Sequence, residues 1–132
     1  MVHTFTIKGR LPDLNDYLKS ARKSYRNRYG TFIAPDNEMK KKWQKHIITF
    51  IRKDLKGLRI TKPVLIHYHY YELDARRDYG NIHAVAQKFI EDALQITKVL
   101  VNDNQKCVKG FTADFDIDKD NPRIVVEIEE VE

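Results

Sequence analysis

The segment from Met39 to Leu55 repeats an apolar residue at every fourth position, and this repeat constrains the fold more than any other feature of the sequence. Its members are Met39, Trp43, Ile47, Ile51 and Leu55. This spacing places their side chains on one face of an α-helix. Asp36 or Asn37 after Pro35 can cap the start, and Gly57 can end it. The pattern predicts an amphipathic helix over residues 36–55.

Strand patterns lie on both sides of this helix. Alternating or β-branched runs predict strands at residues 3–9, 64–73, 108–116 and 124–130, of which 64–73 is expected to be largely buried. A second helix is predicted over residues 81–94. Residues 10–35 show no sustained period, so we interpret them as a basic loop with one or two helical turns near residues 11–18. The order β, α, β, α, β, β predicts an α+β fold, with a mixed β-sheet packed on two main helices.

Length and composition limit the class of protein further. The chain has 132 residues, and no run reaches the roughly 18 apolar residues that cross a bilayer. The first residues lack the layout of a signal peptide. A single cysteine, Cys107, excludes a disulfide framework. We therefore expect one soluble cytoplasmic domain over residues 1–132, with no membrane partner.

Charge divides unevenly along the chain. Residues 1–62 hold 16 Lys and Arg against 5 Asp and Glu, a net charge of +11. Residues 63–132 hold 8 against 14, a net charge of −6. A basic surface favours nucleic acid, whereas clustered carboxylates repel phosphate unless a divalent cation lies between them. The division predicts either metal-dependent phosphate chemistry or a charged surface between two subunits.

Two acidic positions follow apolar runs. Asp78 lies in Arg76-Arg77-Asp78-Tyr79-Gly80-Asn81, between the end of a predicted strand and the start of a helix. This segment could form a phosphate or metal corner, or Asp78 could simply cap the helix while both arginines remain solvated. Asp103 lies in Asn102-Asp103-Asn104, which could supply a second metal ligand or form an ordinary turn. Spacing alone does not choose between these interpretations.

Several motifs in this order resemble the RusA family of Holliday junction resolvases, in its phage and prophage branch from Gram-positive bacteria. They are Gly9-Arg10-Leu11-Pro12-Asp13-Leu14-Asn15, Arg76-Arg77-Asp78-Tyr79-Gly80-Asn81, Lys88-Phe89-Ile90-Glu91-Asp92-Ala93-Leu94, Val101-Asn102-Asp103 and Lys109-Gly110-Phe111. The likeness covers nearly the whole chain. It implies a homodimeric endodeoxyribonuclease that uses Mg²⁺, with Mn²⁺ as an alternative, to cut four-way DNA junctions by paired incisions.

The resemblance also assigns roles to residues. Asp78, Asp103 and Lys88 match the catalytic positions, and Asp78 and Asp103 would be the metal ligands. Lys88 follows the matching asparagine by seven residues instead of three, about one extra helical turn. The residues expected to contact branched DNA are Arg76, Arg77, Asn81, Asn15, Lys19, Arg22, Lys23, Arg26 and Arg28.

One position departs from the family pattern. The chain has Gly80 where the family has a second aspartate in its Asp-x-Asp-Asn motif. Loss of this carboxylate predicts weaker metal binding, so a junction-binding protein with impaired cleavage is the alternative function. A structure-selective RNA nuclease is a third. His67 and His69 share the face of a strand at a spacing that can bind zinc, but no third ligand is evident nearby, so we do not favour a zinc site.

Overall fold

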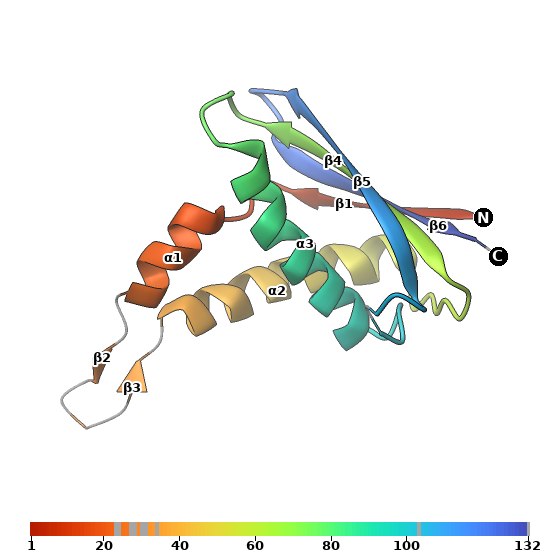
Figure 1. The fold of residues 1–132 in the computed structure, drawn as a ribbon, viewed down its shortest axis with the longest axis horizontal. Helices are drawn as coiled ribbons and strands as arrows, with labels where there is room; N and C mark the ends of the chain where they lie inside the picture. Colours follow the sequence, from red (N-terminus) through yellow and green to blue (C-terminus); the bar gives the residue numbers. More distant parts are fainter. Residues whose placement is uncertain (23–24, 27–28, 30–31, 34, 103, 132) are drawn as a thin grey trace.

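The computed structural model describes residues 1–22, 25–26, 29, 32–33, 35–102 and 104–131. Within these ranges the chain forms three helices and six strands (Figure 1). In chain order they are β1 (Val2–Lys8), α1 (Leu14–Arg22), β2 (Tyr25–Arg26), β3 (Phe32–Ile33), α2 (Pro35–Leu55), β4 (Val64–Glu72), α3 (Tyr79–Ile96), β5 (Val108–Ile117) and β6 (Arg123–Glu130). None of the described helices is long and apolar enough to cross a lipid bilayer.

The four long strands form one mixed sheet in the order β1-β6-β4-β5. Strand β6 runs antiparallel to both β1 and β4, whereas β4 and β5 are parallel and are connected through α3. Strands β2 and β3 form a separate two-stranded ladder. The predicted α+β class and mixed sheet are therefore confirmed.

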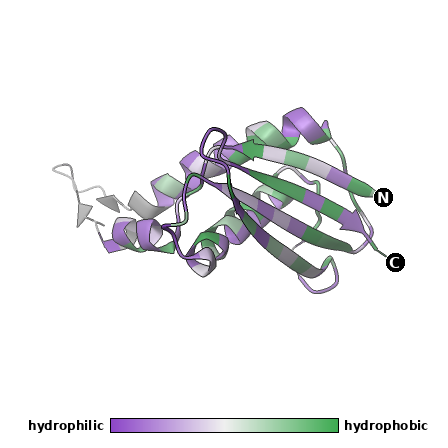
Figure 2. Cartoon of the chain, turned by 90° about the horizontal axis from the view of Figure 1, so that it is seen from above, coloured by the Kyte–Doolittle hydropathy of each residue, from purple (hydrophilic) through white to green (hydrophobic). Residues whose placement is uncertain are grey.

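The helices cover one face of the sheet, and the other face lies open to solvent (Figure 2). Alternate residues of β4 are buried against the helices, namely Val64, Ile66, Tyr68, Tyr70 and Glu72. The residues between them are only partly buried. The prediction of a largely buried strand is therefore confirmed, with the face toward the helices more deeply buried than the other.

Helix α2 confirms the four-residue repeat, since Ile47 and Ile51 are almost completely buried. It also covers the outer edge of β1 at Thr6 and Lys8. The Thr6 amide of β1 donates to Asp54 Oδ2 at 2.9 Å, and the Lys8 carbonyl oxygen lies 2.7 Å from His46 Nε2. Helix α2 therefore satisfies backbone groups that an exposed edge strand would leave open.

Helix α1 is longer than the one or two turns expected in the basic segment. Asp13 and Asp16 cap it reciprocally: the Asp16 amide donates to Asp13 Oδ1 at 2.9 Å, and the Asp13 amide donates to Asp16 Oδ2 at 3.1 Å. Tyr17 packs edge-on against Phe89 of α3. Since α1 contacts both α2 and α3, the layer contains three helices instead of the two main helices predicted.

Polar groups lie between the sheet and α3. The Tyr68 hydroxyl donates to Glu91 Oε2 at 3.1 Å, and the Tyr70 hydroxyl lies 2.6 Å from His83 Nδ1. In the described structure, His83 Nε2 is buried without a hydrogen-bond partner. Burial lowers the pKa of His83 below its usual 6.5, because desolvation penalises the protonated ring. His83 is therefore a candidate source of pH-dependent stability.

We expect the free energy of unfolding to fall as the pH drops below about 6.5. There the unfolded chain protonates His83 while the folded chain, whose His83 pKa is lowered, does not, so acid favours unfolding. The loss continues down to the folded-state pKa. A His83→Phe variant should lose less stability between pH 7 and pH 5 in urea titrations. Parallel pH profiles for the two proteins would contradict this role of His83.

Candidate functional site

The corner between β4 and α3 begins with Asp78, which caps the helix. Asp78 Oδ1 accepts hydrogen bonds from the Gly80 amide at 2.8 Å and the Asn81 amide at 3.3 Å. Its backbone is extended, with φ −68° and ψ 129°. The capping interpretation of Asp78 is therefore confirmed. The side chain remains exposed, so capping does not prevent it from meeting a ligand.

The two arginines before Asp78 have different environments. Arg77 makes paired contacts with Glu72, from Nε to Oε1 at 2.9 Å and from NH2 to Oε2 at 3.0 Å. Its NH1 donates to the Leu11 carbonyl at 2.8 Å. The Glu72 side chain is only 7% exposed. The Arg76 side chain is 90% exposed and lies 3.7 Å from Asp74. Only Arg76 thus fits the expectation of a solvated arginine.

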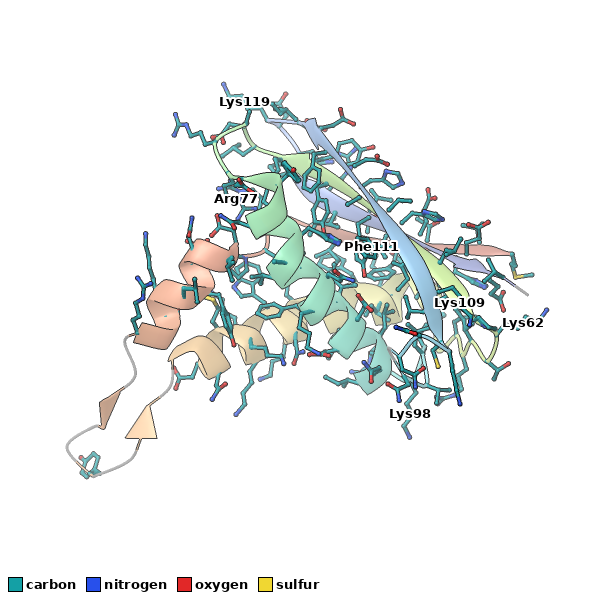
Figure 3. All side chains as sticks on the ribbon, viewed as in Figure 1. Lys62, Arg77, Lys98, Lys109, Phe111 and Lys119 are labelled. Atoms are coloured by element: carbon teal, nitrogen blue, oxygen red, sulfur yellow. The ribbon has the colours of Figure 1, made fainter. Side chains whose placement is uncertain are left out.

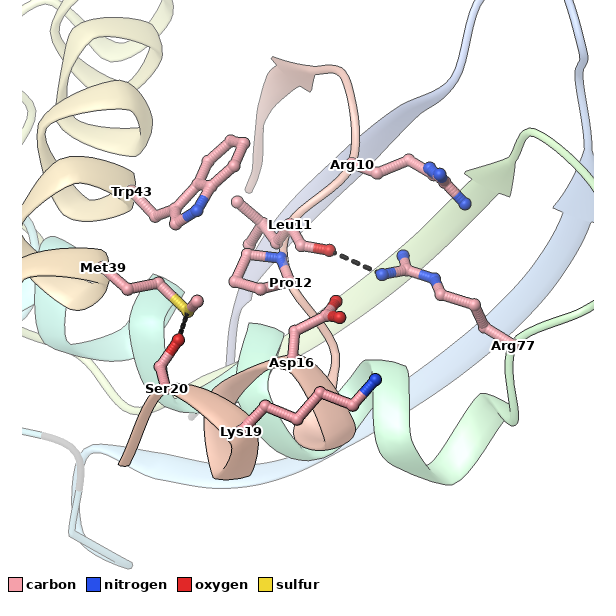
Figure 4. A pocket seen from close by; sticks show the side chains of 9 residues that line it. All are labelled: Arg10, Leu11, Pro12, Asp16, Lys19, Ser20, Met39, Trp43 and Arg77. Atoms are coloured by element: carbon pink, nitrogen blue, oxygen red, sulfur yellow. Dashed lines mark hydrogen bonds between the residues drawn. The ribbon is translucent and has the colours of Figure 1, made fainter. Parts of the chain in front are cut away.

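A cleft opens between the start of α1 and this corner (Figure 4). It has a volume of about 440 Å³ and is lined by residues that include Arg10, Asp16, Lys19 and Arg77. A neighbouring hollow of about 760 Å³ shares these four residues. Its other lining residues are Asp13, Asn15, Leu73, Asp74 and Arg76. Both openings therefore combine basic and acidic side chains.

The hollow brings together four of the residues predicted to contact DNA: Asn15, Lys19, Arg76 and Arg77. It also contains Arg10, which the sequence-based selection of DNA contacts omitted. Arg10 NH1 lies 3.9 Å from Glu72 Oε1, so this residue approaches the same buried carboxylate as Arg77. Arg10 belongs to the Gly9–Asn15 motif, so the family resemblance could have indicated it as a DNA contact. No helical or strand periodicity in the sequence indicated that it lies near residues 73–77.

Lys88 lies farther along α3. Ten residues separate it from Asp78, which corresponds to about 15 Å along the helix axis. Its Nζ lies 3.4 Å from Asp92 Oδ1, and Asp92 Oδ2 also contacts Lys40 of α2 at 3.0 Å. The Lys88 side chain is 63% exposed. The structure therefore separates Lys88 from Asp78 along the helix.

Some predicted residues fall outside the described structure. Asp103, Lys23 and Arg28 lie outside the described ranges, and nothing is described of the Arg26 side chain. Arg22 is exposed in the last turn of α1. Asn81 is partly buried in the first turn of α3. The second predicted metal ligand therefore has no described position relative to Asp78.

Gly80 lies directly against the cap. A Cβ atom at this position would lie 3.2 Å from Asp78 Oδ1, closer than ordinary van der Waals contact. An aspartate at position 80 would thus require a small shift of the Asp78 side chain. The glycine allows the close approach of its own amide to Asp78 without this crowding.

The described residues provide few metal ligands at the corner. They contain no group of three or more His, Cys, Asp or Glu side chains that could hold a metal ion. Glu72 is engaged by Arg77, which leaves Asp78 as the exposed carboxylate at the helix start. Mg²⁺ can bind through only one or two carboxylates together with water and phosphate oxygens. The donor type at Asp78 therefore fits Mg²⁺.

His67 and His69 lie on the open face of the sheet. His67 contacts Glu129 Oε2 at 2.9 Å and Thr112 Oγ1 at 2.8 Å, and His69 contacts Asp114 Oδ2 at 3.1 Å. Each ring is therefore held by side chains from neighbouring strands.

Comparison of the sequence with protein-family models and with curated proteins gives no match. We therefore treat the resemblance to RusA resolvases as a hypothesis about function.

Proposed function

We propose that the chain is a Mg²⁺-dependent endonuclease that cuts four-way DNA junctions, as its resemblance to the RusA family implies. The observation that carries this proposal is the hollow beside the β4–α3 corner. Four predicted DNA-binding residues line it, and Asp78 follows two of them directly in the chain. This arrangement offers phosphate-binding cations next to an exposed carboxylate, the combination that metal-assisted phosphodiester hydrolysis needs.

The cations would bind DNA through its backbone. Arg76 and Lys19 are exposed, so they can contact phosphates without giving up a buried ion pair. Arg77 already bonds Glu72 and the Leu11 carbonyl, so its main contribution is to hold the corner against the start of α1. Junctions of different sequence share the shape of their backbone, so phosphate contacts should dominate recognition.

Asp78 and Asp103 are the residues that would hold Mg²⁺. When bound, the ion would polarise the scissile phosphate and lower the pKa of an attacking water. The two backbone amides that bond Asp78 Oδ1 fix the direction of its carboxylate. Lys88 lies far along α3 and contacts Asp92, so a phosphate-binding role fits it better than a charge at the Asp78 corner.

A homodimer belongs to this proposal. Paired incision of a junction requires two active sites, and a two-fold symmetric protein matches the approximate symmetry of the substrate. The main alternative is a junction-binding protein with impaired cleavage. Gly80, at the position where the family has a second aspartate, favours this second candidate.

The test is an incision assay with three labelled substrates: a four-way junction, a linear duplex of the same sequence, and single-stranded RNA. We expect junction incision in Mg²⁺ or Mn²⁺, little duplex cleavage, and none in a chelator. Each metal is added over a range of concentrations. Tight junction binding without incision in either metal would refute the nuclease and support the binding protein. Preferential cutting of RNA would instead support an RNA nuclease.

A further inference from the structure

The two edges of the main sheet differ in how they are covered. At β1, helix α2 supplies partners for the Thr6 amide and the Lys8 carbonyl. At β5, the only neighbouring strand in the described part of the chain is β4. Within the described residues, no hydrogen bond involves the backbone of residues 109–117 apart from the pairing of β5 with β4. An open strand of ten residues without proline is a template for pairing with another chain.

The side chains of β5 favour such pairing. Phe111, Ala113, Phe115 and Ile117 point to the helical side of the sheet, and Phe111 and Ile117 are 51% and 59% exposed. Figure 3 shows Phe111 on this strand next to α3. Phe115 stacks on Tyr70 with ring centroids 4.7 Å apart, and Phe111 stacks on His83 at 5.0 Å. The strand therefore carries ordered, half-exposed aromatic rings along its open edge.

We propose that β5 pairs with β5 of a second copy of this chain, antiparallel and with Ala113 on the two-fold axis. The two sheets then join into one sheet of eight strands. The inference deepens the proposed function and rests on it for its purpose, since paired incision needs two subunits. Its structural basis is separate, because it follows from the open edge and the side chains of β5.

The register follows from which side chains would face each other. In an antiparallel pair, directly opposite residues lie on the same face of the sheet. The two-fold axis must therefore lie between one residue of β5 and the same residue of the second copy. With Ala113 on the axis, Phe111 lies opposite Phe115 of the second copy, and this aromatic pair occurs twice. Thr112 lies opposite Asp114 of the second copy. An axis through Asp114 would oppose two identical carboxylates, and an axis through Thr112 would lose the aromatic pairs.

The charge of β5 favours a second copy over nucleic acid as the occupant. Asp114 and Asp116 lie on this strand, and Asp118 follows it. These carboxylates repel phosphates, whereas in the Ala113 register Asp114 lies opposite Thr112 and Asp116 opposite Gly110 of the second copy, so no two carboxylates are directly opposed. Antiparallel pairing about an axis perpendicular to the sheet also keeps both helical layers on the same side. Both Asp78 corners would then lie on the same side of the joined sheet.

Cysteine cross-linking tests both the pairing and its register. In a Cys107→Ser background, three single-cysteine variants are compared: Thr112→Cys, Ala113→Cys and Asp114→Cys. Opposite residues in an antiparallel pair have Cα atoms about 4.5–5.5 Å apart, within the range that a disulfide spans. We expect Ala113→Cys to form the covalent dimer most completely under mild oxidation. Light scattering should give about twice 15.6 kDa for the wild-type chain.

Two surface variants test the pairing without cysteine. Phe111→Lys should weaken dimerisation by about tenfold or more, because it replaces an aromatic pair with buried positive charge. Thr4→Lys, on the covered edge strand β1, should leave dimerisation unchanged. Circular dichroism checks that both variants fold.

A monomer at all concentrations would overturn the proposal, as would cross-linking preferentially at position 112 or 114. An unchanged mass with weaker DNA binding in Phe111→Lys would show that the edge binds nucleic acid instead. None of these measurements uses incision. A failure of the dimer is therefore distinct from a failure of the nuclease.

Discussion

Replacing Asp78 with asparagine should reduce junction incision by about 100-fold or more while leaving the protein folded. The expected loss reflects several kcal/mol of charge stabilisation that a carboxylate-held metal supplies. Asparagine caps helices about as well as aspartate, so the bonds to the Gly80 and Asn81 amides can be kept. Loss of the negative charge at the helix start should cost less than about 1 kcal/mol of stability.

Single-turnover incision rates and urea unfolding measure these two effects separately. Asp120→Asn is the control, because it removes an exposed carboxylate that lines neither opening and should change the rate only slightly. Asp78→Ala removes both the charge and the cap, so it should lose about 1 kcal/mol of stability in addition to activity. Incision by Asp78→Asn at the wild-type rate would show that Asp78 is only a helix cap.

Arg77→Ala should destabilise the fold by about 3 kcal/mol, because it leaves the buried carboxylate of Glu72 with only Arg10, 3.9 Å away, as a counter-charge. The two side chains are 15% and 7% exposed, so solvent screens this pair little. The substitution also removes the donor to the Leu11 carbonyl. Arg76→Ala, one residue away, should change stability by no more than about 0.5 kcal/mol, since that side chain is 90% exposed.

Guanidinium chloride unfolding of both variants tests this difference. The double variant Glu72→Leu with Arg77→Ala should recover part of the lost stability, because neither charge is then left buried alone. Junction affinity should respond in the opposite order at a temperature where both single variants are folded, with the larger loss in Arg76→Ala. Equal destabilisation by the two single substitutions would contradict the distinction between the arginines.

Much of the fold could be predicted from local patterns. The four-residue repeat that includes Ile47 and Ile51 predicted α2 to within one residue at its start, and alternating residues predicted the four long strands. Helix α1 was predicted too short although Leu14, Tyr17 and Leu18 have helical spacing, because this pattern covers only nine residues within an otherwise irregular segment. Its stability depends on the Asp13 and Asp16 caps and on the packing of Tyr17 against α3, which periodicity does not reveal.

The candidate site was harder to predict because it depends on contacts between distant segments. Arg76 and Arg77 are adjacent and chemically alike, so the sequence could not indicate that only Arg77 binds Glu72. Its bond to the Leu11 carbonyl spans 66 residues of sequence. Arg10 approaches the same carboxylate through the same tertiary arrangement. The secondary structure around each of these residues could be predicted from the local sequence. The tertiary contacts between them could not.

The cover that α2 places over β1 bears on how far copies of this chain can associate. A sheet with two open edges can add strands at both ends and grow into a fibre. Here one edge is occupied by Asp54 and His46, so pairing through β5 uses the remaining open edge of each copy. The joined sheet would then end on both sides in a strand whose edge α2 occupies at Thr6 and Lys8. Further strand addition would have to displace these contacts, which favours an assembly of two molecules.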